Sequence, residues 1–181
     1  MNVTWVSRFP NGHETGRFLT LDMGGTNLRV CDVRLSDRRR DFEQTQRKFK
    51  IPLEVKSGTA EELWDFVADR LESFLEEHPS GAAEGTNLPL AFTFSFPVDQ
   101  QNIRSGVLQH WTKKFNVSGV EGQDVVPQLE AALVKKVSSS SSEIISTRDY
   151  LDLSHLYLEY PRGCRCAYQR YDGNPHRFAL S

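Results

Sequence analysis

Residues of the kinds that hold phosphate follow directly on an apolar segment near the N-terminus. The stretch reads Phe18-Leu19-Thr20-Leu21-Asp22-Met23-Gly24-Gly25-Thr26-Asn27-Leu28-Arg29-Val30. Glycines let backbone N–H groups turn toward an anion and let its oxygens approach closely. Thr26 and Asn27 add side-chain donors. Arg29 adds a fixed positive charge, and Asp22 can hold Mg²⁺ directly or through water. The pattern predicts a phosphate-gripping hairpin, and a plain Gly-Gly hairpin turn is the alternative.

Strands are predicted on both sides of this turn, over about 18–22 and 28–35, and a third over 42–51. The turn is therefore not the strand–loop–helix phosphate loop, which also needs Gly-Lys-Ser/Thr. Thr59-Ala60-Glu61-Glu62 is a capping box that begins a helix, and His78-Pro79 ends it. The apolar face of this helix is predicted to hold Leu63, Phe66, Val67, Leu71, Phe74 and Leu75.

A buried strand over 88–97 and a second helix over about 124–136 follow. The residues of this second helix expected to face inward are Val125, Val126, Leu129, Ala132 and Leu133. The order is a three-strand meander, a helix, a strand and a helix. It predicts an α/β fold that matches the start of an actin-like, ribonuclease-H-like nucleotide-binding lobe.

Length, charge and cysteine spacing narrow the class of protein. The 181 residues allow one domain with a real core, and the net charge of −2 argues against nucleic acid as a partner. No apolar run is long enough to span a membrane, and the N-terminus carries no signal-like segment. Cys31, Cys164 and Cys166 form no metal-ligand pattern, so we expect a reduced, cytoplasmic protein.

The composition changes near Lys136. All five tyrosines and two of the three cysteines lie in 137–181, which begins with Val137 and the run Ser138–Ser142. No sustained helical or strand periodicity follows, so we expect 1–136 to form the folded part. The segment 137–181 is expected to be a Ser-rich linker and a poorly ordered tail, and an ordinary linker to a small module is the alternative.

Three motifs, in order, resemble the hexokinase and glucokinase family. The stretch 21–30 resembles the phosphate hairpin of that family, Phe92-Thr93-Phe94-Ser95-Phe96-Pro97 its sugar-binding strand end, and Leu108-Gln109-His110-Trp111-Thr112-Lys113 its second sugar-binding segment. The lead-in Trp5-Val6 and Phe9-Pro10-Asn11-Gly12 also fits, as does 122–129. The resemblance covers about 3–136 and is closest to eukaryotic, fungal-like members.

This resemblance implies ATP-dependent phosphorylation of a hexose such as glucose at its 6-hydroxyl, with Mg²⁺, as the first step of glycolysis. The residues it places on the sugar are Ser95, Phe96, Thr112 and Lys113. The residues it places on the ATP phosphates and metal are Asp22, Gly24, Gly25, Thr26, Asn27 and Arg29. One departure is Lys114, where the family usually has a glycine. Because such a glycine often marks a special backbone angle, lysine there costs about 1 kcal/mol.

The resemblance also implies parts that this sequence lacks. In the family the second helix leads into a strand that ends in Asn-Asp, where the aspartate is the general base, and the Ser run stands there instead. Neither Asp149 nor Asp152 matches that motif. With the second lobe also missing, we expect no activity from the chain alone and self-association through a bare sheet edge. The alternatives are a non-catalytic glucose-binding or regulatory protein, and an interaction module built on the tail.

Overall fold

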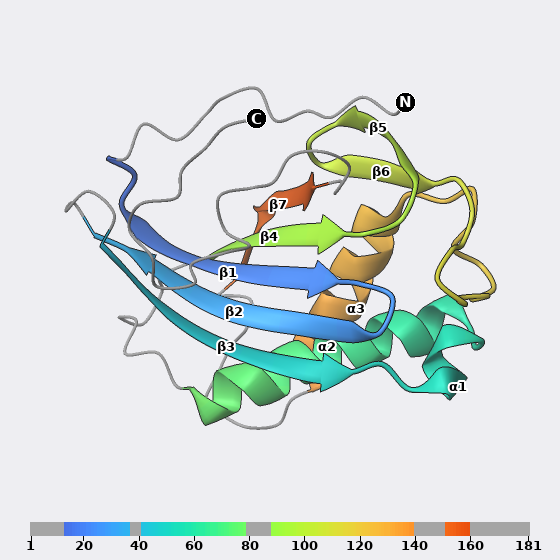
Figure 1. The fold of residues 1–181 in the computed structure, drawn as a ribbon, viewed down its shortest axis with the longest axis horizontal. Coiled ribbons are helices and arrows are strands. Elements are labelled where there is room, and N and C mark those ends of the chain that lie inside the picture. The colour runs from blue at the N-terminus through green and yellow to red at the C-terminus, as the bar shows by residue number, and fades with distance from the viewer. Residues whose placement is uncertain (1–12, 37–40, 79–87, 140–150, 160–181) are drawn as a thin grey trace, which may run out of the picture.

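The computed structural model describes residues 13–36, 41–78, 88–139 and 151–159 (Figure 1). Five strands form one sheet in the order β3-β2-β1-β4-β7, and β5 pairs with β6 in a separate hairpin. Two long helices lie along one face of the larger sheet. In chain order the elements are β1 (Gly16–Met23), β2 (Asn27–Leu35), β3 (Phe42–Lys50), α1 (Leu53–Lys56), α2 (Ala60–Glu77), β4 (Leu88–Phe94), β5 (Val98–Asn102), β6 (Ser105–Leu108), α3 (Val125–Ser139) and β7 (Leu151–Glu159).

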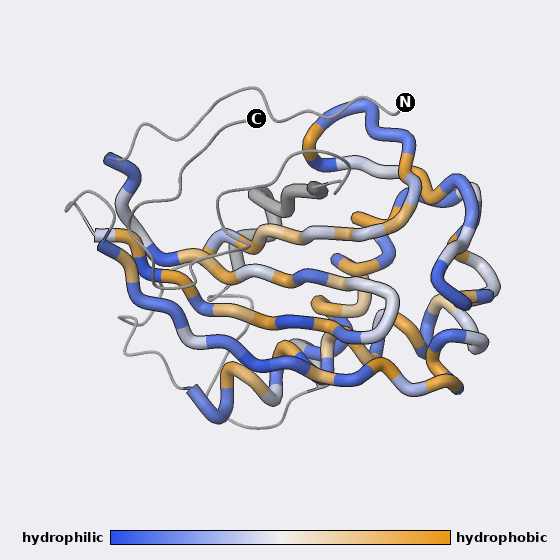
Figure 2. The backbone as a smooth tube through the Cα atoms, in the orientation of Figure 1, coloured by the Kyte–Doolittle hydropathy of each residue, from blue (hydrophilic) through white to orange (hydrophobic). Residues whose placement is uncertain are grey.

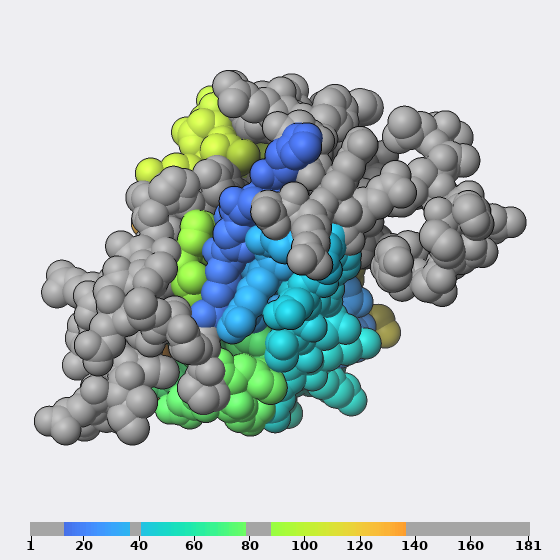
Figure 3. Space-filling view, turned by 90° about the vertical axis from the view of Figure 1, so that its left-hand side faces the viewer, coloured from blue at the N-terminus to red at the C-terminus, as the bar shows by residue number. Residues whose placement is uncertain are grey.

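The predicted order of a three-strand meander, a helix and a further strand is confirmed, and the structure adds the strand directions. β1 runs antiparallel to β2, β2 antiparallel to β3, and β1 parallel to β4. Seen from the end opposite the β1–β2 turn, β1, β2 and β3 form neighbouring bands with α2 beside them (Figure 3). Short elements that the sequence analysis did not anticipate are α1 and the β5–β6 hairpin, whose strands have few apolar residues.

Alternation along the strands separates an apolar face from a polar one. The hydrophobic segments concentrate in the central strands and in the helices behind them (Figure 2). Fully buried side chains on the helix-facing side include Leu19, Leu21, Met23, Leu28, Val30, Leu90, Phe92 and Phe94. Burial of this continuous apolar surface is the main force that holds the helices on the sheet.

The capping box predicted at the start of α2 is present. Glu62 N–H donates to Thr59 Oγ1 at 3.3 Å, and Thr59 N–H donates to Glu62 Oε2 at 2.7 Å. Most of the predicted apolar face is buried, Phe66 is only partly buried, and Trp64 and Ala68 join the face. Trp64 Nε1–H donates to Gln128 Oε1 at 2.7 Å and so links α2 to α3. Within the described ranges, no helix combines the length and apolarity needed to cross a bilayer.

The expectation of no strand in 137–181, and of a bare β4 edge, is wrong. β7 pairs in parallel with β4, first at Leu88↔Leu151 and Pro89↔Asp152 and then at Ala91↔Tyr157. Between the second and third of these pairs β4 advances two residues while β7 advances five. The apolar residues of β7 shift phase at the same place, from 151 and 153 to 156 and 158. A single alternating pattern is therefore absent, which is why the sequence analysis missed the strand.

Other sequence expectations lie outside the described residues. They concern the lead-in within 1–12, most of the Ser run, and Asp149 with the rest of 140–150 and 160–181. The separate-tail assignment for 137–181 stays a prediction, although α3 continues past Lys136 to Ser139.

We predict that a chain ending at Ser139 self-associates, because it leaves the ladder groups of β4 unpaired. Size-exclusion chromatography with light scattering is expected to show a higher mass for residues 1–139 than for 1–181. A chain ending at Glu159 keeps β7 and serves as the matched control, with the mass of 1–181 expected. If 1–139 is as monomeric as the control, β7 does not protect this edge.

Candidate functional site

The three sequence motifs meet at one end of the molecule. Because β1 and β4 are parallel, their carboxyl ends lie side by side, with Met23 paired to Phe94. Ser95 N–H continues this pairing by donating to Met23 O at 3.1 Å. The β1–β2 turn, α1 and the segment 109–124 gather at the same end, on the right in Figure 1. The strand end and the turn are thus adjacent because of sheet pairing.

The β1–β2 turn is closed by backbone hydrogen bonds on both sides. Gly24 N–H donates to Asn27 O at 3.0 Å, and Ile51 N–H donates to Thr26 O at 3.0 Å. Neither glycine has a positive φ, so backbone freedom is not what the turn requires of them. At Gly25 the reason is close approach, because a Cβ there would lie 2.9 Å from both Cβ and Cδ of Lys113. At Gly24 a Cβ would meet only Asn27 O, at 3.7 Å.

A charged row crosses the sheet beside this turn, on the face away from the helices. Arg29 Nη1 lies 3.2 Å from Asp22 Oδ2. Burial raises the pKa of Asp22, while the positive charges of Arg29 and Lys113 act in the opposite direction. Desolvation outweighs them, so this carboxylate holds its charge less readily than an exposed one.

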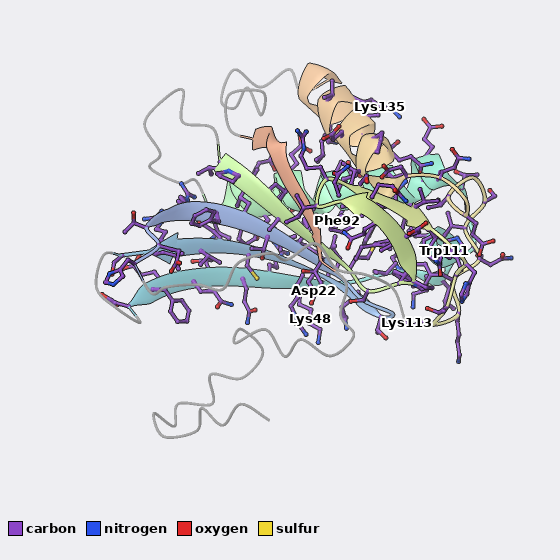
Figure 4. The ribbon with its side chains drawn as sticks, turned by 90° about the horizontal axis from the view of Figure 1, so that it is seen from above. Asp22, Lys48, Phe92, Trp111, Lys113 and Lys135 are labelled. Atoms are coloured by element: carbon purple, nitrogen blue, oxygen red, sulfur yellow. The ribbon has the colours of Figure 1, made fainter. Side chains whose placement is uncertain are left out.

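Lys48 extends the same row, because it pairs with Arg29 across β2 and β3. Figure 4 shows Lys48 and Asp22 on the side of the sheet opposite α3. Lys48 was not among the residues predicted for the site. Its signal was the alternation of β3, where buried Phe49 faces the helices and Lys48 must point the other way.

Lys113 lies in the second predicted sugar-binding segment and contacts both the β1–β2 turn and the end of β4. Its Nζ donates to Ser95 O at 2.5 Å and lies 5.1 Å from the centre of the Phe96 ring. Burial lowers the pKa of Lys113, and the charge of Asp22 opposes this shift. Both Lys113 and Lys114 have left-handed backbones, with φ of 56° and 65°. The special angle expected at Lys114 is confirmed, and the one at Lys113 was not anticipated.

The segment that carries Lys113 is anchored by a cluster of aromatic side chains. Phe96 is 1% exposed and meets Trp111 edge-to-face at 4.9 Å between ring centres, and Trp111 stacks on Phe115 at 5.2 Å. Trp111 Nε1–H donates to Val117 O at 2.8 Å, and Trp111 N–H donates to Glu121 Oε1 at 2.5 Å. The Phe96 side chain is part of the core, so any contact of this residue with a ligand must come from its backbone.

The structure therefore brings most of the predicted site residues together. Direct contacts or close charge interactions connect Asp22, Gly25, Arg29, Ser95, Phe96 and Lys113. Gly24, Thr26 and Asn27 complete the turn, and the carbonyl of Thr112 accepts the Phe115 N–H at 3.1 Å next to Lys113. Lys56, which also contacts the turn, had no sequence signal.

Asp22 is a suitable ligand for Mg²⁺ that arrives with a nucleotide. In the part of the chain that the structure describes, no group of three or more His, Cys, Asp or Glu forms a metal cage. Mg²⁺ usually keeps several waters and binds one or two carboxylates plus the phosphates of its substrate. A lone carboxylate beside two cationic side chains fits that arrangement, and does not fit a site for the metal alone.

Comparisons with known proteins point to one family. The sequence model of the family described as Hexokinase matches residues 1–146. The hexokinase of Emericella nidulans is 54% identical over 130 residues, which is 72% of this chain and 26% of that protein. Hexokinase-2 of Saccharomyces cerevisiae is 46% identical over 134 residues, 73% of this chain and 27% of that protein.

Solved structures agree. The hexokinase from Schistosoma mansoni, complexed with glucose, superposes with a TM-score of 0.73 and 35% sequence identity, covering 88% of this chain and 32% of that one. A second hexokinase structure gives a TM-score of 0.65 at 29% identity, covering 85% of this chain and 32% of that one. The chain spans about a quarter of the length of the curated relatives it matches.

We predict that Lys114→Gly raises the free energy of unfolding by about 0.5–1 kcal/mol, because glycine accepts the left-handed backbone angle without strain and loses part of this gain to chain entropy. Urea denaturation measures the change. Lys114→Ala is the matched control, since it removes the same side chain but keeps Cβ and the strain. Equal stabilisation by alanine and glycine would show that the angle is not the cause.

A second prediction concerns Asp22→Asn. Burial raises the pKa of Asp22 in the folded state above the ordinary 3.8 that is expected in the unfolded state. At a pH between the unfolded-state pKa and the raised folded-state pKa, the folded state therefore binds more protons than the unfolded state. The free energy of unfolding of the wild type therefore falls as pH rises through this window, and the asparagine variant lacks that fall. In urea denaturation from about pH 4 to pH 7, the free energy of unfolding of the variant should rise relative to that of the wild type. A variant that is less stable at pH 7 would mean that pairing with Arg29 and Lys113 outweighs burial.

Proposed function

The chain belongs to the hexokinase family, and on that basis we propose that residues 1–136 form one half of a site for ATP-dependent phosphorylation of a hexose such as glucose at its 6-hydroxyl. The observation that carries the proposal is the position of Lys113. Its ammonium donates to Ser95 O, its side chain packs on Gly25, and its charge interacts with that of Asp22. A residue expected on the sugar thus touches the turn expected on the phosphates. We place this reaction at the first step of glycolysis, in the cytoplasm.

The sugar side of the proposed site is polar and preformed. Ser95, Thr112 and Lys113 offer hydroxyl and ammonium groups to a ligand rich in hydroxyls. Such groups discriminate against analogues that lack a hydroxyl, because a polar group is then left unpaired. The glucose bound to the Schistosoma mansoni hexokinase supports a hexose of this kind as substrate.

The phosphate side supplies position and charge. Phosphoryl transfer depends mainly on alignment and on stabilisation of negative charge, rather than on covalent chemistry by the protein. Thr26 and Asn27 would donate to phosphate oxygens, Arg29 would neutralise their charge, and Asp22 would orient Mg²⁺ through its waters. Mg-ATP, when bound, supplies the phosphoryl group and part of that neutralisation.

By themselves, we propose, residues 1–181 bind these ligands without turning them over. Among residues 1–181, none matches the family motif for the general base, and no segment matches the opposing lobe. A general base contributes about 10²–10⁴ in rate, and closure of an opposing surface over the substrates completes such sites.

A coupled assay for hexose 6-phosphate tests this proposal, with purified 1–181, Mg-ATP and saturating glucose. We expect no turnover above an Asp22→Ala control, because no matched residue takes the proton of the 6-hydroxyl. Turnover that depends on Asp22 would contradict the proposed inactivity. Glu159→Gln would then be the next variant, since β7 places Glu159 in register with Thr93, which itself pairs with Asp22.

Glucose binding is the second arm of the same test. Trp111 is half-buried next to Thr112, so its fluorescence should report a bound sugar. Thr112→Val is expected to weaken glucose binding about tenfold by removing a hydroxyl partner. Thr45→Val makes the same change at an exposed position of β3 and should have no effect. Failure of the wild type to respond to any hexose would contradict the proposed sugar site.

A further inference from the structure

A buried lysine lies behind the β1–β2 turn. Lys56, the last residue of α1, is only 9% exposed. Its Nζ donates to Gly25 O at 2.8 Å and lies 5.3 Å from the centre of the Phe115 ring. Lysines are seldom buried, because removing the ammonium from water is costly unless it finds strong partners.

The partners of Lys56 leave its positive charge without a neutralising carboxylate. Among the described residues, no Asp or Glu lies within ion-pair distance of Nζ, and the contacts are a backbone carbonyl and an aromatic face. Both stabilise a cation without cancelling its charge. The turn therefore has a cationic side chain fixed on its inner side.

The backbone of Lys56 is held by the segment that carries the second sugar motif. Asn116 N–H donates to Lys56 O at 2.7 Å, and Ser118 N–H donates to Gly58 O at 3.0 Å. The ammonium reaches the turn from this fixed backbone. Lys56 thus links α1, to which it belongs, with the β1–β2 turn and with the segment 111–118.

The bond to Gly25 O sets the direction of the next N–H group. The peptide unit between Gly25 and Thr26 is planar and trans, so its C=O and N–H point in opposite directions. With the carbonyl held by Lys56 on the buried side, the Thr26 N–H points away from Lys56, and Thr26 is exposed. Ile51 N–H holds the following carbonyl, that of Thr26. The peptide units on both sides of Thr26 are therefore fixed before any ligand arrives.

We propose that Lys56 is a positioning residue for phosphate: by holding the Gly25 carbonyl it aims and polarises the Thr26 N–H toward the anion. A cation on the carbonyl of a peptide strengthens its N–H as a donor, because hydrogen bonds along one peptide unit polarise each other. The inference deepens the proposed function, on which the identity of the anion as a nucleotide phosphate rests.

Lys56→Met tests the inference, since methionine keeps most of the apolar stem over Phe115 and removes the charge and donors. In the ligand-free chain, we expect the ¹⁵N–¹H signals of Gly25 and Thr26 to move and their amide exchange to accelerate. The Kd for Mg-ATP should rise about tenfold, as expected for loss of one nearby charge in a partly shielded setting. The Kd for glucose should stay within about twofold, because the backbone of Lys56 still holds Asn116.

Two further variants separate positioning from general effects. Lys56→Arg keeps a charged donor and should restore most of the Mg-ATP affinity. Lys50→Met removes an exposed lysine from the neighbouring strand and controls for the loss of one positive charge, with less than about a twofold change expected after screening by salt. If Lys56→Met does not fold, Lys56→Gln, which keeps a polar end group without charge, takes its place.

The outcomes are distinct. Unchanged Gly25 and Thr26 signals in Lys56→Met, or an equal loss of Mg-ATP affinity in Lys50→Met, would overturn the inference. A third outcome is that the signals move in Lys56→Met but the wild type does not bind Mg-ATP. That result would support the positioning by Lys56 and overturn the proposed phosphate role of the turn. Moved signals together with the tenfold loss and arginine rescue would support both.

Discussion

The parallel pairing of β1 with β4 is the constraint on which the rest of the site depends. It runs from Leu19↔Leu90 to Met23↔Phe94 and brings the carboxyl ends of two strands, far apart in sequence, to the same edge. Buried alternate residues fix the register, because a slip of one position would turn the apolar face of each strand toward solvent. Ser95 and the β1–β2 turn are therefore neighbours before any ligand binds.

Two lysines then hold the turn at Gly25 in different ways. The side chain of Lys113 packs 2.9 Å from where a Cβ of Gly25 would be, and the ammonium of Lys56 binds the Gly25 carbonyl. Neither contact needs a ligand, so the order of this region is provided by the fold rather than taken from binding energy. The cost is local: Lys113 and Lys114 adopt left-handed backbones, and the pKa of Asp22 is raised by burial. Strain and desolvation of this kind are typical of functional sites.

The sequence predicted those parts of the molecule whose signals are local. The meander, the capping box at Thr59, the buried strand and the two long helices follow from periodicity and end signals. The special angle at Lys114 followed from the family pattern. What it did not predict depends on distant partners or broken patterns. Lys56 acts on a carbonyl 31 residues away, the two halves of β7 alternate in different phases, and β5 has few apolar residues. Gly25 was expected for its backbone freedom, whereas the structure requires it for close packing.

The most direct test of a preformed half-site is a map of ¹⁵N–¹H shifts in residues 1–181 titrated first with glucose and then with Mg-ATP. We expect glucose to move the signals of Ser95, Thr112 and Lys113, and Mg-ATP to move those of Gly24, Gly25, Thr26 and Asn27, as two adjacent sets. Shifts that are absent, or spread over the sheet without these residues, would contradict the assignment of both ligands to this end of the fold.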